Sequence, residues 1–209
     1  MNRFLVVILS FLFISSFCYT QDNVAWNGFK VKKKLNEKLL LDVTPILRLH
    51  QDISDYQNTS VDISLNYSFK PGWSVQALSR TWFMPDRSDR QFFWADLAYT
   101  WKRDKMTLKN RIRNHRAFDI GGFTDNDYLR YMLTYVPTTF SRWSPVINLE
   151  PWFQFNGIDD FTRFRVEVGG NISFSDSWKL LLMYRRQEEI QVNPDNDINM
   201  AVITLTRIL

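Results

Sequence analysis

Charged side chains recur at alternate positions along several segments of the sequence, and most of them are arginines. Arg111 and Arg113 show this spacing, as do Arg163, Arg165 and Glu167. Guanidinium and carboxylate groups in this pattern could form paired networks, or their surplus positive charge could favour small anions. The complete set comprises Asp42, Arg48, Asp62, Arg80, Asp96, Arg111, Arg113, Arg130, Glu150, Arg163, Arg165, Glu167 and Arg185, which is eight arginines against five acids.

Enzymatic chemistry has less support in the sequence. A hydrolase needs a nucleophile, a base and an orienting group within hydrogen-bond reach, and the chain has only two histidines, His50 and His115. Neither lies in a His-x-Ser arrangement, and no metal-binding, phosphate-binding or nucleophile-elbow motif occurs. We therefore expect no enzyme activity, no cofactor and no metal site. The alternative from a different class is a membrane-embedded hydrolase that acts on lipid or peptide.

The segments that carry these residues have a period of two. Between residues 59 and 70, Val61 and Ile63 alternate with Asp62 and Ser64. Successive side chains of a β-strand point to opposite faces, so this strand has one apolar and one polar face. The same pattern predicts eleven strands, at residues 24–34, 38–50, 59–70, 73–84, 93–101, 106–117, 129–135, 147–155, 164–174, 178–184 and 198–208.

Strand length distinguishes a membrane barrel from a soluble sandwich. The predicted strands average about twelve residues, which at roughly 3.3 Å per residue gives about 40 Å. A tilt near 40° reduces the height to about 30 Å, the thickness of a bilayer core, whereas strands of soluble domains usually have about five or six residues. The sequence predicts an all-β fold, an antiparallel transmembrane β-barrel of ten to twelve strands. A soluble periplasmic β-barrel or sandwich that binds a ligand is a third interpretation.

The odd strand number conflicts with a rule for such barrels. Single-chain bacterial barrels have even strand numbers, and eleven strands would place the first and the last strand parallel. We therefore expect that one segment is miscounted. The weakest is 24–34, which carries the basic run Lys32, Lys33 and Lys34. Without this segment the barrel has ten strands, and division of a long segment gives twelve.

The N-terminal residues predict export. Met1, Asn2 and Arg3 precede an apolar run at residues 4–17, and a small-x-small cleavage site ends at Thr20. We expect a cleaved signal peptide at residues 1–20 and a barrel domain at residues 21–209, located in the outer membrane of a Gram-negative bacterium. The net charge of +4 then does not indicate a nucleic-acid site, because an exported chain does not meet cytoplasmic nucleic acid.

The predicted connections are of two kinds. Short ones at residues 35–37, 71–72, 103–105 and 175–177, with a looser one at 138–144, alternate with longer polar ones, as in outer-membrane barrels. Aromatic residues gather beside the short connections, where the membrane interface would lie. These predicted interface residues are Phe69, Trp73, Trp101, Tyr135, Trp143, Phe174 and Trp178.

The polar strand faces would point into the barrel. With ten to twelve strands the interior is too narrow for a wide aqueous channel, so we expect the charges to pair across it and fill it. An anion-favouring path is the alternative, supported by the surplus of arginines. The expected partners are outer-membrane lipid and, during insertion, the barrel-assembly machinery, and the protein is expected to be a monomer.

Short motifs in a fixed order carry a resemblance. They are Trp26, Lys34-Leu35, Arg48, Leu65-x-Tyr67, Arg111-x-Arg113-x-x-Arg116, Leu129-Arg130-Tyr131, and Glu150 followed by Trp152, Phe153 and Phe155-Asn156. In this order the sequence resembles the bacterial domain-of-unknown-function 2490 family over essentially the whole mature chain. The resemblance implies an outer-membrane β-barrel, of a kind found mostly in the Bacteroidota, without an assigned activity. Two departures are Asn114-His115, where the family tends to place a Glu, and the terminal Leu209, where insertion signals favour an aromatic residue.

Overall fold

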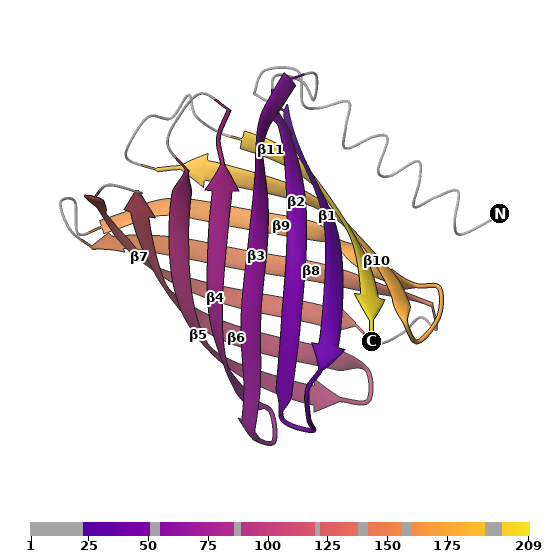
Figure 1. Cartoon of the computed structure of the whole chain (residues 1–209). Helices are drawn as coiled ribbons and strands as arrows, with labels where there is room; N and C mark the ends of the chain where they lie inside the picture. The colour runs from indigo at the N-terminus through magenta and orange to yellow at the C-terminus, as the bar shows by residue number, and fades with distance from the viewer. Residues whose placement is uncertain are drawn as a thin grey trace.

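The chain forms one closed barrel of eleven β-strands in a computed structural model (Figure 1). The structure describes residues 23–50, 55–85, 89–119, 122–137, 142–155, 160–190 and 198–209. No helix in these ranges is long and apolar enough to span a membrane. The predicted signal peptide at residues 1–20 lies outside the described residues.

The strands follow the alternating segments of the sequence. They are β1 (Asn23–Lys34), β2 (Leu39–His50), β3 (Asp55–Lys70), β4 (Trp73–Phe83), β5 (Arg90–Arg103), β6 (Met106–Asp119), β7 (Gly122–Pro137), β8 (Trp143–Phe155), β9 (Asp160–Ser173), β10 (Trp178–Glu189) and β11 (Ile198–Ile208). The all-β barrel prediction is confirmed. Several strands extend further into the longer connections than the pattern indicated.

The expectation of a miscounted strand is wrong. The doubtful first segment is β1, and it pairs with β2 on one side and with β11 on the other (Figure 1). Its pairing with β11 is parallel and runs from Asn23 opposite Asn199 to Lys32 opposite Ile208. All other neighbouring pairs are antiparallel. A parallel ladder has evenly spaced hydrogen bonds and is only slightly less stable per residue, so it can close a barrel with an odd number of strands.

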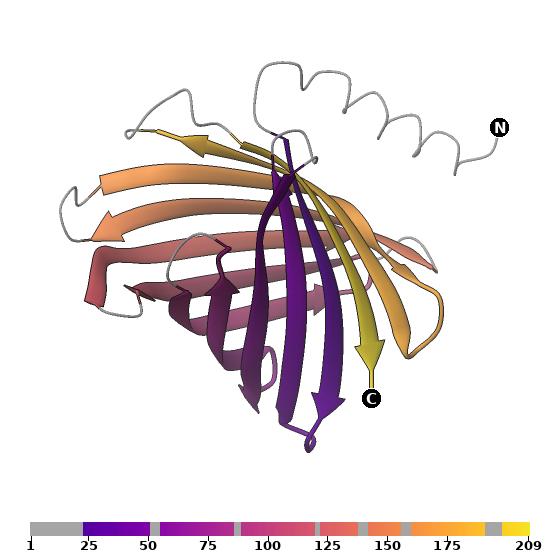
Figure 2. The ribbon, with the colours of Figure 1, turned by 45° about the horizontal axis from the view of Figure 1, so that its top comes forward.

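The two faces of the strands differ in polarity, opposite to the pattern of a soluble protein. Ile63, Ile112 and Phe93 expose 52%, 47% and 45% of their surface on the outer face, whereas Arg48 and Glu150 on the inner face expose only 2% each. Figure 2 shows that the strands curve around one common interior. Large apolar residues are usually buried and charged ones exposed in soluble domains. This barrel therefore has an apolar outside and a polar inside.

One sector of the interior is apolar. Val24, Val146, Met183, Met200 and Val202 form a buried cluster with contributions from β1, β8, β10 and β11. Trp26, Val136, Leu181 and Ile198 pack against this cluster. Burial of these side chains stabilises the region around the parallel closure through the hydrophobic effect.

A tight turn fixes one end of the barrel. Gly72, between β3 and β4, has a φ of 78°, a conformation that favours glycine. The Thr100 amide of β5 donates a hydrogen bond of 2.7 Å to the Gly72 carbonyl oxygen. A Cβ atom at Gly72 would lie 2.6 Å from the Thr100 carbonyl oxygen. The turn can pack this closely against β5 because residue 72 lacks a side chain.

Candidate functional site

The inner face carries a network of arginines and carboxylates, which we call the arginine belt. It lies at mid-height and extends toward the longer loops. Its members come from nine of the eleven strands, β1 and β11 being the two that contribute none. They are Arg48, Arg80, Arg111, Arg113, Arg130, Arg163, Arg165 and Arg185 with Asp62, Asp96, Glu150, Glu167 and Glu189.

Glu150 of β8 is the centre of the belt. Its carboxylate accepts hydrogen bonds of 2.9 Å from both Arg111 of β6 and Arg130 of β7, and one of 3.0 Å from Arg165 of β9. The indole of Trp152 donates a further hydrogen bond of 3.2 Å to it. One carboxylate therefore joins guanidinium groups from three strands. Such a buried charge is stabilised only while its partners are present.

Each remaining carboxylate of the belt pairs with an arginine on a neighbouring strand, and Asp96 also lies 3.8 Å from Arg111 Nε. Arg113 donates two hydrogen bonds of 2.6 Å to Asp96, and Arg80 binds Asp62 in the same two-pronged geometry. The other two pairs are Arg185 with Glu167 and Arg163 with Glu189. Each pair joins neighbouring strands at directly opposed positions. Two parallel N–H···O bonds fix the guanidinium plane as well as its position.

Inward tryptophans stack on the arginines of the belt. The guanidinium carbon of Arg130 lies 3.8 Å from the ring centroid of Trp152, and that of Arg113 lies 4.9 Å from Trp94. Cation–π contacts of this kind stabilise desolvated guanidinium groups. The interpretation of the sequence missed these rings, because it assigned no tryptophan to the inner face of the strands. Their spacing of two positions from inward charged residues, as in Trp94 and Asp96 or Glu150 and Trp152, was the available signal.

Arg48 has no carboxylate partner among the described residues. Its guanidinium group lies between Trp26 and Trp82, at 4.2 and 4.5 Å from their ring centroids. Its Nε and Nη2 atoms are buried without a hydrogen-bond partner. The ring of Trp26 also contacts Arg185 of β10 at 4.7 Å, and Arg80 of β4 lies 6.0 Å away. Side chains from four strands that are not all adjacent thus meet at Trp26.

His115 is a buried side chain of β6. It exposes 7% of its surface, and neither ring nitrogen has a hydrogen-bond partner among the described residues. Its ring lies among Phe92, Trp94, Tyr128 and Trp152, with centroid distances of 5.0 to 6.0 Å. Within the described ranges, no three His, Cys, Asp or Glu side chains are arranged to hold a metal ion. The surroundings of His115 are those of a packed aromatic side chain.

The end of the barrel near the short turns carries lysines instead. We call this set the lysine mouth; it consists of Lys30, Lys32, Lys38, Lys70, Lys102 and Lys109. Lys32 lies 3.8 Å from Asp42. The sequence interpretation omitted these lysines, although Lys109 lies two residues before Arg111 and Lys30 four residues after Trp26. The period of two was the signal that could have placed them inside.

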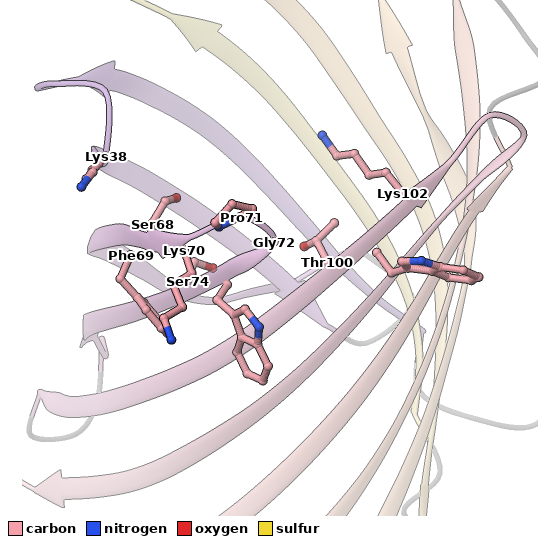
Figure 3. A pocket seen from close by; sticks show the side chains of 11 residues that line it. Lys38, Ser68, Phe69, Lys70, Pro71, Gly72, Ser74, Thr100 and Lys102 are labelled. Atoms are coloured by element: carbon pink, nitrogen blue, oxygen red, sulfur yellow. The ribbon is translucent and has the colours of Figure 1, made fainter.

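Three of these lysines surround a pocket at the barrel rim (Figure 3). Lys38, Lys70 and Lys102 come from the β1–β2 turn, the end of β3 and the end of β5. The pocket has a volume of about 830 Å³. Its polar lining also includes Ser68, Ser74 and Thr100, and its apolar lining includes Phe69, Pro71, Trp73 and Trp101. The pocket therefore combines ammonium groups, hydroxyl groups and aromatic rings.

All seven predicted interface aromatics lie at this same end of the barrel. Phe69, Trp73 and Trp101 line the pocket, and Phe69 and Trp73 form a row with Tyr99, with ring centroids 6.4 and 4.8 Å apart. Phe174 lies in the β9–β10 turn and exposes 63% of its surface. Tyr135, Trp143 and Trp178 lie at the ends of β7, β8 and β10 that adjoin the short connections.

Comparison with known proteins identifies a family. The family described as "Protein of unknown function (DUF2490)" matches residues 23–199. The chain belongs to this family. No curated protein and no solved structure matches significantly. The recognition based on the ordered motifs is thus confirmed, whereas the DUF2490 description itself assigns neither an activity nor a location.

This DUF2490 member has Asn114-His115 in β6, where the family tends to place a Glu, and the structure shows how the arginines of β6 are paired without it. The side chains of Arg111 and Arg113 are inside, whereas Arg116 is on the outer face, where it forms an ion pair of 2.8 Å with Asp127. His115 occupies the inward position between them. The belt arginines of β6 find their carboxylates on other strands, at Asp96 and Glu150. Pairing in this chain therefore does not need a glutamate within β6.

Proposed function

We propose that this protein is an outer-membrane β-barrel whose lumen is closed by its own side chains, with a structural or small-solute-related role. The observation that carries the proposal is the inverted polarity of the barrel. Exposed large apolar residues occur on β1 to β9 and on β11, and they include Ile63, Ile112 and Phe155. Soluble monomers rarely expose continuous apolar surface of this extent, whereas lipid-facing strands of membrane barrels require it.

The arginine belt supports a closed lumen. Arg111 of β6 binds Glu150 of β8 past the intervening β7, and the guanidinium carbon of Arg80 of β4 lies 6.0 Å from the ring centroid of Trp26 of β1. These contacts join strands that are not neighbours, so the side chains extend into the interior. A barrel of this strand number has little room beyond its side chains. We infer that wide aqueous passage is blocked at the level of the belt.

The membrane-embedded hydrolase has weaker support. Its base would be His115, whose ring packs against aromatic side chains and makes no hydrogen bond to a nucleophile among the described residues. We therefore propose that the protein is not an enzyme and needs no cofactor. An altered lipid profile after deletion of the gene would favour the hydrolase instead.

The partners follow from the proposed location. We propose a monomer that contacts outer-membrane lipid, uses the barrel-assembly machinery during insertion and does not bind nucleic acid. Fractionation of cells that express the chain tests the location. The protein should appear in the outer-membrane fraction and migrate differently on gels before and after heating. Recovery from the soluble periplasm would overturn the membrane assignment.

A substitution on the outer face tests contact with lipid directly. Ile63→Arg places a charge on the proposed lipid-facing surface in the middle of β3, and near the midplane this costs roughly 2 to 4 kcal/mol. The matched control is Tyr56→Arg, on the same strand near its loop end, for which about 0 to 1 kcal/mol is expected. Chemical unfolding of both variants in lipid vesicles measures the difference. Equal stabilities would contradict a lipid-facing surface.

Planar-bilayer recordings test the closed lumen. The wild-type protein should give no steady ion conductance, because side chains fill the interior at the belt. A stable conductance would overturn this part of the proposal and leave the membrane location untouched.

A further inference from the structure

We propose that the lysine mouth binds a phosphate group, as a free oxyanion or as the headgroup of an anionic phospholipid. The proposal deepens the function proposed above and rests on it for the lipid source alone. The site comprises an outer set, Lys38, Lys70 and Lys102 around the rim pocket, and an inner set, Lys30, Lys32 and Lys109 (Figure 3 shows the outer set).

The inner lysines belong to the interior. Phe29, next to Lys30, exposes 41% of its surface on the outer face, and Ile112 exposes 47%. Lys30 and Lys109 have the opposite orientation to these residues, because side chains alternate along a strand. Lys30 is two positions before Lys32, which lies 3.8 Å from the inward Asp42, and Lys109 is two positions before Arg111, which binds Glu150 in the interior. The two lysine-bearing strands therefore face a common space.

Most cations of the lysine mouth have no ion-pair partner among the described residues. Among the described residues, Asp42 is the one acidic side chain on the inner face between the belt and the short turns, and it is 3.8 Å from Lys32. The other inward carboxylates bind arginines of the belt. No ion pair joins Lys30, Lys109 or the three rim lysines to a described residue. Clustered cations that are partly removed from water need an anion close by.

The surroundings provide neutral donors as well. Ser68, Ser74 and Thr100 line the rim pocket, and Thr44 and Thr204 lie beside Gly28, between Trp26 and Lys30. Hydroxyl groups together with several ammonium groups suit an oxyanion with several acceptor oxygens. Aromatic rings on the outer side of the pocket suit the glycerol and acyl part of a lipid at a membrane interface.

Phosphate titration of the refolded full-length protein tests the proposal. Calorimetry in a zwitterionic detergent and a chloride buffer should show saturable binding of inorganic phosphate or of phosphatidylglycerol. The inner variant Lys30→Gln with Lys109→Gln, or the outer variant Lys38→Gln with Lys70→Gln and Lys102→Gln, should weaken binding at least about tenfold, the effect of one lost charge-assisted contact. The matched control, Lys33→Gln with Lys105→Gln, removes two exposed lysines outside the site and should bind as the wild type does.

The pattern of losses identifies the source of the phosphate group. Loss of inorganic phosphate binding in the inner variant indicates a free oxyanion. Loss of phosphatidylglycerol binding in the outer variant, with phosphatidylcholine bound weakly by all variants, indicates a lipid headgroup. Absence of saturable binding of both probes, or equal binding by all variants, overturns the proposal. Neither result depends on cell fractionation, so failure of this proposal and failure of the membrane assignment are distinguishable.

Thermal unfolding gives a second measurement, which excludes misfolding of a variant as the cause of lost binding. Heat-modifiable migration first shows that each variant is folded. Without phosphate, the inner variant should melt at a higher temperature than the wild type, because repulsion among unpaired ammonium groups is removed. Phosphate should raise the melting temperature of the wild type and of the control variant but not that of the inner variant. A lower melting temperature of the folded inner variant in the absence of phosphate would overturn the proposal.

Discussion

The arginine belt and the lysine mouth are both cationic regions of one interior, but they balance their charge differently. In the belt, Glu150 alone binds three arginines, and four further carboxylates each bind at least one. In the lysine mouth, Asp42 is the one inward carboxylate among the described residues. Arg165 and Arg130 are buried, whereas the side chain of Lys32 retains 32% exposure.

The difference follows from access to solvent. In the belt, where the side chains are buried, a cation must have a fixed anion or an aromatic ring beside it, because water cannot compensate the charge. Near the short turns, where the side chain of Lys32 stays partly exposed, water and mobile anions can do so. The choice of residue agrees with this difference, since the planar guanidinium group binds carboxylates with two hydrogen bonds and stacks on indole, while the ammonium group is a strongly hydrated point charge.

The largest expected effect comes from removal of the central carboxylate of the belt. Glu150→Ala leaves Arg111, Arg130 and Arg165 without their shared anion, and we expect a loss of roughly 3 to 5 kcal/mol in the free energy of unfolding. Urea unfolding of the refolded barrel measures it. Glu37→Ala in the exposed β1–β2 turn is the control and should change stability by less than about 0.5 kcal/mol. Equal losses of stability in the two variants would show that a belt carboxylate contributes no more to stability than a surface carboxylate.

A pair within the belt should show strong coupling. Arg113→Ala, alone or with Arg111→Ala, lowers stability because Asp96 then lies buried without its partners. A double-mutant cycle with Asp96→Ala should give a coupling of roughly 1.5 to 3 kcal/mol, the range for hydrogen bonds to charged groups. The exposed pair Arg116 and Asp127, measured the same way, should give a much weaker coupling, because solvent screens it. Wild-type melting of the Arg113 variant would refute pairing as the stabilising element.

Sodium chloride should change the stability contribution of the lysine mouth more than that of the arginine belt. Added sodium chloride screens the lysine mouth, which solvent reaches, but affects the buried pairs of the belt little. We expect the wild type to gain about 0.5 to 1 kcal/mol at high salt. The Lys30→Gln and Lys109→Gln double variant should lose most of this gain. A salt response that is the same in both proteins would show that the lysine mouth is not the origin of the effect.

The smallest expected net change concerns Arg48, the belt arginine that has no carboxylate partner in the part of the chain that the structure describes. Arg48→Met removes the stacking on Trp26 and Trp82 but also removes buried donor atoms that lack partners. These effects oppose each other, so stability should stay within about 1 kcal/mol of the wild type. Thermal unfolding under conditions identical to those for Glu150→Ala gives the comparison. A loss of stability as large as that of Glu150→Ala would contradict this expectation and would indicate that Arg48 stabilises the barrel through an ion pair.

The sequence predicted most of the fold because alternation is a local property. Val61 and Asp62 are adjacent in the sequence, so their side chains must point to opposite faces of the strand. The arginines of the belt were placed inside for the same reason. The strand number was questioned on a general rule, and the pairing of β1 with β11 shows why the rule failed here. Nothing local to either strand indicates whether the first and last strands meet in parallel.

The candidate site was predicted only in outline. The inward arginines and Glu150 could be named, but their pairing could not. Arg111 of β6 and Glu150 of β8 meet past the intervening β7, and this contact depends on register and tilt. The tryptophans that stack on arginines were overlooked, as were Lys30 and Lys109. The predicted interface aromatics lie at one end of the barrel, because each adjoins a short connection that the sequence marks locally.

The amino-acid sequence by itself determined where the strands run and which side chains share a face, since both depend on neighbours within a few positions. Only the tertiary structure decided that eleven strands close through one parallel pair and that one glutamate binds three arginines. It also decided that, among the described residues, Lys32 is the one member of the lysine mouth with an ion-pair partner. These features depend on register and on distances across the barrel, which arise only when residues far apart in the chain are brought together.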